Sequence, residues 1–68
     1  ISPLDFLQEV RINIAKDLLK TSNLSINEIV DKVGYQDTGF FTMLFKKHMA
    51  TSPIAYRETV RAKLFSTS

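Results

Sequence analysis

Few side chains in this sequence are of the types that catalyse reactions or bind metal ions. His48 is the one histidine, and there is no cysteine. Zinc sites need several such ligands and an activated nucleophile needs a neighbouring base, so neither can be assembled here. Asp31 and Asp37 flank a predicted turn, where we expect them to serve as a surface residue and a helix cap. We therefore expect no enzyme activity, no metal site and no cofactor.

A second group of side chains has types and spacing that fit either a contact surface or plain exposure to solvent. They begin shortly after a turn that contains Gly34, and they are Thr38, Gly39, Thr42 and Met43. Side chains at the start of a helix reach base edges when the helix enters the major groove by its N-terminal half. On spacing alone, this face suits solvent contact around one packed methionine equally well.

Basic side chains on neighbouring segments are candidates for contacts with DNA phosphates, which give affinity and register without sequence information. They are Lys46, Lys47, Lys32 and Arg11. The predicted helix start at Ser25 is a further candidate, because free backbone amides at a helix N-terminus attract phosphate. Surface lysines also serve solubility alone, and a net charge of +2 is too small to decide between these roles.

The scaffold for these residues is predicted to be helical, beginning with a helix over residues 3–20. Ser2, Pro3 and Asp5 have the spacing of a helix N-terminus with a serine cap and a proline in the first turn. The apolar residues of this segment form one broad stripe, of the kind that faces a core. The stripe consists of Leu4, Leu7, Val10, Ile14, Ala15, Leu18 and Leu19.

A second, short helix is predicted to follow Ser25, which forms the pattern of a capping box with Glu28. Its predicted buried side consists of Ile26, Ile29, Val30 and Val33. Gly34 comes directly afterwards and predicts a left-handed turn, a conformation that would cost another residue about 1 to 2 kcal/mol.

A third helix is predicted from Thr38 to Met49, with Asp37 as its cap. One face carries Phe41, Leu44, Phe45 and His48, and the opposite face carries Thr38, Thr42 and Lys46. The aromatic residues Phe40, Phe41 and Phe45 are expected in the core, because their spacing is that of a buried stripe rather than a platform for base stacking.

A fourth helix is predicted over residues 53–64, with Ser52 as its cap and Pro53 in its first turn. Its docking residues are expected to be Ile54, Tyr56, Val60 and Leu64. Strand patterns and repeats are absent from the sequence. The predicted fold is therefore all-α: one domain over residues 1–68, a small homeodomain-like bundle of about four helices.

The location of the protein is predicted from two negative features of the sequence. No apolar run approaches the roughly 18 residues of a membrane span. The first residues also lack the basic start of a signal peptide. We expect a cytoplasmic protein with no membrane contact.

Residues 25–49 follow the plan of a helix-turn-helix, in which a short helix and a tight glycine-containing turn precede a helix with a polar outer face. This plan alone is not specific to one family, but the order of residues in the sequence is. It runs R-I-N-I-A-K-D-L-L-K from Arg11, S-I-N-E-I-V-D-K-V-G-Y-Q-D from Ser25, F-T-M-L-F-K-K from Phe41 and S-P-I-A-Y-R from Ser52. Over roughly residues 3–57 the sequence resembles, without gaps, the C-terminal signature of the AraC/XylS family of bacterial transcription regulators.

The resemblance assigns each predicted helix to a part of the family's DNA-binding domain. The DNA-binding domain of that family has two helix-turn-helix units joined by a long helix. Residues 3–20 would be this linker helix, residues 25–49 the second unit and residues 53–64 the closing helix, with the first unit absent. Tyr56 and Arg57 are expected to hold the closing helix to the core.

The same resemblance implies the function and the partners. The chain is expected to bind double-stranded DNA in transcription regulation, with Thr38, Gly39, Thr42 and Met43 next to bases. RNA polymerase is a candidate further partner, and the intact regulator is a candidate dimer. The alternative function is a protein-interaction module in which the same face of the third helix docks into a protein groove.

Three residues depart from the family pattern. Val30 stands where alanine is usual and adds volume at the helix crossing. Ala50 replaces a frequent glycine, so that turn either avoids a positive φ or tolerates strain. Met43 replaces a frequent arginine, which leaves the start of the third helix without a partner for guanine and predicts a modest preference for thymine, on the order of 1 kcal/mol per base.

Overall fold

The computed structural model describes residues 2–65, and within that range it contains helices and no strand. The helices are α1 Pro3–Thr21, α2 Ile26–Lys32, α3 Thr38–Met49 and α4 Pro53–Phe65. Each boundary lies within a residue or two of its predicted place, and the all-α prediction is confirmed. The side chain of Leu64, predicted to help dock α4, lies outside the described part of the chain.

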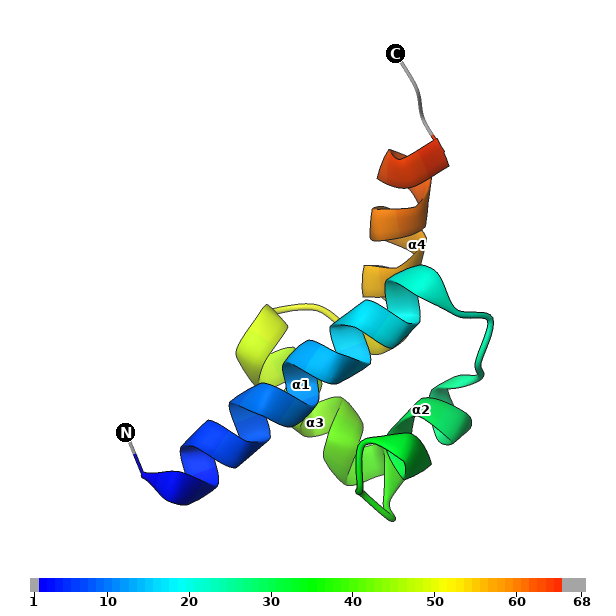
Figure 1. Cartoon of the computed structure of the whole chain (residues 1–68). Coiled ribbons are helices and arrows are strands. Elements are labelled where there is room, and N and C mark those ends of the chain that lie inside the picture. The colour runs from blue at the N-terminus through cyan, green and yellow to red at the C-terminus, as the bar shows by residue number, and fades with distance from the viewer. Residues whose placement is uncertain (1, 66–68) are drawn as a thin grey trace.

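The long helix α1 organises the molecule (Figure 1). It runs across α3 and reaches α4 with its C-terminal end, while α2 and α3 lie together on one side. All three other helices contact α1. No helix within residues 2–65 has the length and apolar character needed to cross a membrane.

The helix starts form as the capping residues predict. Ser2 Oγ accepts a hydrogen bond from the Asp5 amide at 3.1 Å, and Ser52 Oγ accepts one from the Ala55 amide at 3.2 Å. A cap of this kind stabilises a helix by about 1 kcal/mol, because it satisfies an amide that has no partner within the helix.

The core lies between the C-terminal half of α1 and the other helices. Its buried members are Ile12, Ala15, Leu19, Ile29, Val30, Val33, Phe41, Leu44 and Phe45. Val30, the unusual residue at the helix crossing, is accommodated there with 2% of its surface exposed.

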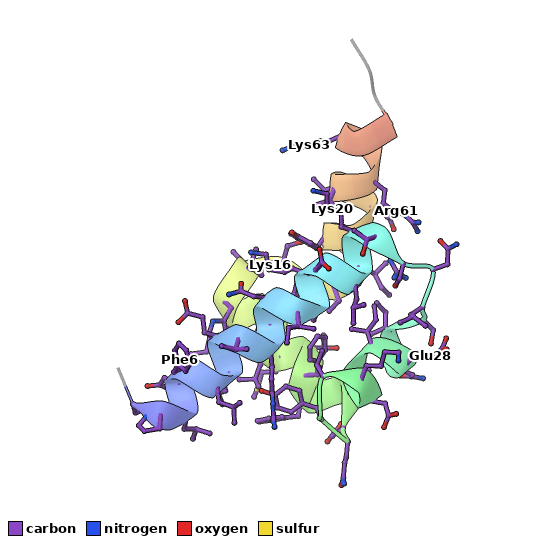
Figure 2. The ribbon with its side chains drawn as sticks, in the orientation of Figure 1. Phe6, Lys16, Lys20, Glu28, Arg61 and Lys63 are labelled. Atoms are coloured by element: carbon purple, nitrogen blue, oxygen red, sulfur yellow. The ribbon has the colours of Figure 1, made fainter. Side chains whose placement is uncertain are left out.

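The N-terminal half of α1 departs from the predicted stripe. Leu4 is 63% exposed, Leu7 41% and Phe6 59%. Ile14, in the second half of the helix, is 49% exposed because it lies on the side of α1 opposite to the buried Ile12 and Leu19. Figure 2 shows Phe6 far along α1 from α2 and α4. The prediction that this part of the stripe faces a core is wrong for the chain as described, because α2, α3 and α4 cover only the second half of α1.

Two residues of α3 also differ from the prediction. Phe41, Leu44 and Phe45 are buried, but Phe40 is 42% exposed and His48 is exposed. Phe40 lies at the edge of the core, where its ring meets that of Tyr35 at 5.9 Å. Residue spacing predicts the angle of a side chain around the helix, but not how far along the axis the neighbouring helices reach.

Two residues of α4 dock this helix as predicted. Arg57 donates from Nε to the Leu19 carbonyl at 3.1 Å and from Nη2 to the Ser22 carbonyl at 3.3 Å. Tyr56 packs its ring against Phe45 at 5.5 Å. Arg57 thus satisfies carbonyls at the C-terminal end of α1. Ile54, in contrast, is 60% exposed and does not dock the helix as predicted.

Ala50 ends α3 in the left-handed region. Its φ is 59° and its ψ is 19°, and its amide donates to the Lys46 carbonyl at 2.8 Å. Of the two possibilities that the sequence leaves open at this turn, the structure has the strained one.

Candidate nucleic-acid interface

The interface candidates are carried by α2, the turn after it and α3. The start of α2 is fixed by a reciprocal capping box: Ser25 Oγ accepts from the Glu28 amide at 3.2 Å, and the Ser25 amide donates to Glu28 Oε1 at 3.0 Å. The bond from the Ser25 amide to the carboxylate lowers the pKa of Glu28, because it favours the carboxylate over the protonated acid, and the side chain of Ser25 beside the carboxylate lowers it as well. The nearby charge of Lys32 lowers this pKa further.

The turn between α2 and α3 is a Schellman motif centred on Gly34. The Tyr35 amide donates to the Val30 carbonyl at 3.0 Å, and the Gly34 amide donates to the Asp31 carbonyl at 3.1 Å. Gly34 has φ +95°, outside the region that residues with a Cβ adopt readily. The predicted left-handed turn is confirmed.

Arg11 of α1 packs directly on this turn. Its guanidinium carbon lies 5.0 Å from the centroid of the Tyr35 ring, a cation–π contact. A Cβ placed on Gly34 would lie 3.3 Å from Arg11 Nη2. The long helix therefore supports the turn that sets the angle between α2 and α3.

The start of α3 is held in two ways. Asp37 Oδ1 accepts from the amides of Gly39 at 2.9 Å and Phe40 at 3.4 Å, which confirms the predicted cap. The hydroxyl of Thr38 donates to Asn27 Oδ1 at 2.7 Å and so joins the first residue of α3 to α2.

The four predicted base-proximal residues lie together on the N-terminal half of α3. Met43 is 57% exposed and Gly39 is exposed, whereas Thr38 and Thr42 are half-buried. A Cβ on Gly39 would lie 3.2 Å from Asp37 Oδ1, so glycine leaves room for the capping carboxylate.

The predicted phosphate-contacting residues lie in different settings. Lys46 and Lys47 are exposed in the last turn of α3, and Lys32 is exposed in the last turn of α2. Arg11 is half-buried and engaged with Tyr35. Ser25 shares the start of α2 with the Glu28 carboxylate, whose negative charge opposes a phosphate there.

Asn27 belongs to this site and is not predicted from the sequence. It is exposed on a short helix and lies eleven residues before Thr38, its hydrogen-bond partner. Asparagine at such a position resembles any solvent-exposed residue. The signal that identifies it is the approach of α3 to α2, which only the folded chain provides.

A metal site and a second concave site are other kinds of functional site that a small domain can carry. Residues 2–65 contain no group of three or more histidine, cysteine or carboxylate side chains placed to hold a metal ion. An open groove of about 320 Å³ between α1 and α4 is lined by Lys20, Tyr56, Val60 and Lys63. None of the predicted DNA-contacting residues lines it, and Figure 2 shows Lys20 and Lys63 beside α4.

Comparison with known proteins gives matches that agree in kind. The family described as "Helix-turn-helix domain" matches residues 1–59. The chain is 44% identical to the transcriptional regulator AlkR of Acinetobacter baylyi over 57 residues, which cover 84% of this chain and 19% of AlkR.

Solved structures share the same arrangement of helices. The C-terminal domain of AraT, a response regulator from Geobacillus stearothermophilus, matches with a TM-score of 0.84 and 41% identity over 87% of this chain and 49% of that one. The DNA-binding domain of the global transcriptional factor AdpA, solved in complex with a target DNA, matches with a TM-score of 0.91 and 30% identity. That match covers 98% of this chain and 60% of the AdpA chain.

Proposed function

Since this chain belongs to the AraC/XylS family of helix-turn-helix transcription regulators, we propose that it binds DNA sequence-specifically and contacts bases through the N-terminal half of α3. The proposed base-contacting residues are Thr38, Gly39, Thr42 and Met43. The observation that carries the proposal is the exposure of Met43, which lies opposite the buried face of α3 in a rigidly capped helix start. The chain is not an enzyme.

Phosphate contacts form the second part of the proposal. Lys46 and Lys47 are the foremost candidates, because both are exposed on the helix that would enter the groove. Lys32 lies on the preceding helix. Arg11 and Ser25 remain predictions of lower rank, since the first is committed to Tyr35 and the second lies beside Glu28.

We further propose that the four helices are the second half of an AraC-type DNA-binding domain, with residues 3–20 as the linker helix, 25–49 as the helix-turn-helix and 53–64 as the closing helix. Two facts support this. The chain spans 49% and 60% of the AraT and AdpA domains. In addition, Leu4, Phe6 and Leu7 expose apolar surface on the half of α1 that the other helices do not cover. A first helix-turn-helix unit would bury that surface.

The phosphate contacts are tested by salt dependence. Replacing Lys46 and Lys47 by alanine in the intact regulator should weaken binding to all DNA sequences alike. The slope of log affinity against log salt should flatten by about one unit per lysine that contacts phosphate. An unchanged slope together with an altered site preference would refute this assignment.

The base contacts are tested by exchanging the chemistry of the reading face. Met43→Arg should create a preference for guanine, because arginine bonds to the N7 and O6 acceptors of that base. In the parent, uracil in place of thymine should weaken binding at one or two positions by about 1 kcal/mol, the value expected for a methyl contact. Uracil that costs nothing at any position would rule out reading of the methyl group.

Three properties of the full-length protein stay predictions. They are contact with RNA polymerase, pairing of two regulators and location in the cytoplasm. The relatives are about five times longer than the matched segment, so each of these is to be tested on the intact protein.

A further inference from the structure

The hydrogen bond between Asn27 and Thr38 fixes the direction in which the Thr38 hydroxyl can bond. A hydroxyl offers one hydrogen and two lone pairs, whereas the oxygen of an asparagine amide only accepts. At 2.7 Å from Asn27 Oδ1, the Thr38 hydroxyl is therefore the donor. What it has left for any other partner is its capacity to accept.

The place of this hydroxyl makes the restriction relevant to DNA. Thr38 is the first residue of α3, directly after the Asp37 cap, and it is half-buried beside α2. Asn27 is exposed. The pair thus lies at the surface of the molecule, at the end of α3 that the proposed function directs into the groove.

Bases differ in the major groove by what they donate and accept. Adenine presents the N6 amino group and cytosine the N4 amino group, while guanine and thymine present oxygen acceptors at the corresponding place. A hydroxyl that can only accept bonds to an amino group and leaves a facing oxygen unpaired.

We propose that Asn27 is a specificity-determining residue, which holds the Thr38 hydroxyl as an acceptor so that the base facing it is adenine or cytosine. The inference rests on the proposed contact of α3 with bases. It assigns Thr38 a preference distinct from the thymine preference expected of the apolar Met43.

Thr42 provides a matched comparison on the same helix. It is half-buried one turn later, and its hydroxyl has no hydrogen-bond partner within residues 2–65. A free hydroxyl rotates to donate or to accept, so Thr42 tolerates either kind of base edge. The bond to Asn27 is the contact that distinguishes the hydroxyl of Thr38 from that of Thr42.

The experiment begins with the intact regulator and selection of its site from a random DNA pool. The position whose preference changes in Thr38→Val is the base that faces Thr38. The parent should select adenine or cytosine there. A nucleoside analogue that lacks the amino group, purine for adenine or 2-pyrimidinone for cytosine, should weaken parent binding by about fivefold, the size of one hydrogen bond. The Thr38→Val variant should lose nothing further on the analogue.

The Asn27→Ala variant tests the role of the asparagine itself. Freed from its partner, the Thr38 hydroxyl can also donate, so the preference for adenine or cytosine over guanine and thymine should shrink towards equality. The slope of affinity against salt should stay unchanged, because asparagine carries no charge. Thr42→Val is the control and should leave the preference at this position intact. Circular dichroism checks that each variant folds. If Asn27→Ala does not fold, the measurement with the base analogue on the parent protein still tests the inference.

The outcomes separate the inference from the function beneath it. Three results would overturn the inference but not the proposed function, provided that changes at Thr42 and Met43 still alter the selected site. The first is selection of guanine or thymine by the parent at the position that faces Thr38. The second is the absence of any position that responds to Thr38→Val, and the third is a full preference kept by the folded Asn27→Ala variant. If no variant of Thr38, Thr42 or Met43 alters the site or the affinity, α3 does not contact bases and both fall.

Discussion

The turns that end α2 and α3 both use a positive φ, yet one contains glycine and the other alanine. Gly34 has φ +95°, and Ala50 has φ 59°. The second value lies within the small left-handed region that residues with a Cβ enter at a cost, whereas the first lies beyond it. The surroundings differ as well, because Arg11 lies against Gly34.

The comparison shows that a left-handed turn can restrict the choice of residue in two ways, through its backbone conformation and through the space beside its Cβ position. Backbone conformation alone permits alanine at the end of α3 at the expense of some strain. At the end of α2, conformation and the close approach of Arg11 act together. The turn that orients the proposed reading helix is therefore the one that tolerates least.

The largest effect is expected at the stricter turn. Gly34→Val should destabilise the fold by about 2 to 3 kcal/mol, because a β-branched residue pays for left-handed backbone and presses on Arg11. Urea unfolding followed by circular dichroism, without DNA, measures the change. A midpoint equal to that of the parent would show that the turn has another geometry.

At the looser turn the opposite change should help. Ala50→Gly should stabilise the protein by about 0.5 to 1 kcal/mol, since relief of left-handed strain outweighs the greater entropy of glycine in the unfolded chain. The same unfolding assay applies. A loss of stability would mean that Ala50 is not strained and would remove the contrast between the turns.

A double-mutant cycle sharpens the comparison by isolating Arg11. Gly34→Ala should cost about 0.5 kcal/mol less in an Arg11→Ala background, because the added methyl no longer meets the guanidinium. Arg11→Ala alone should be mildly destabilising, since it removes the cation–π contact with Tyr35. If the effects of Gly34→Ala and Arg11→Ala on the free energy of unfolding simply add, the need for glycine at position 34 comes from backbone conformation alone.

The smallest effect concerns the opposite end of α2. The pKa of Glu28 is lowered in the folded state from its ordinary value of 4.5 by its bonds to Ser25, so the carboxylate adds stability above that pH. This contribution is lost as the pH falls through the folded pKa. Glu28→Gln keeps an acceptor for the Ser25 amide without the charge, so the parent should be slightly more stable at pH 7 and the two should converge in acid. A constant difference across pH would contradict the charge effect.

The sequence predicts well those parts of the fold that depend on contacts between residues close together in the chain. Caps such as Ser25 and Asp37 bond to amides two or three residues away, so their patterns determine where helices begin. Burial depends on neighbours distant in sequence. The exposure of Leu4 and His48 could not be predicted from helical periodicity, because it depends on where other helices stop.

The candidate site divides in the same way. The family resemblance predicts the proposed reading face from its motif, and the structure brings Thr38, Thr42 and Met43 together on α3. The partner of Thr38 is not predictable, since Asn27 becomes its neighbour only when α3 folds back on α2.

The two hydrogen bonds of Arg57 affect the order in which the helices can pack while the chain is being synthesised. Their acceptors, Leu19 and Ser22, precede Arg57 by 38 and 35 residues. A ribosome therefore releases α1, α2 and α3 while the carbonyls at the end of α1 still await their donor. The nascent chain can assemble its helix-turn-helix early, but α4 can lock onto α1 only after Arg57 has emerged.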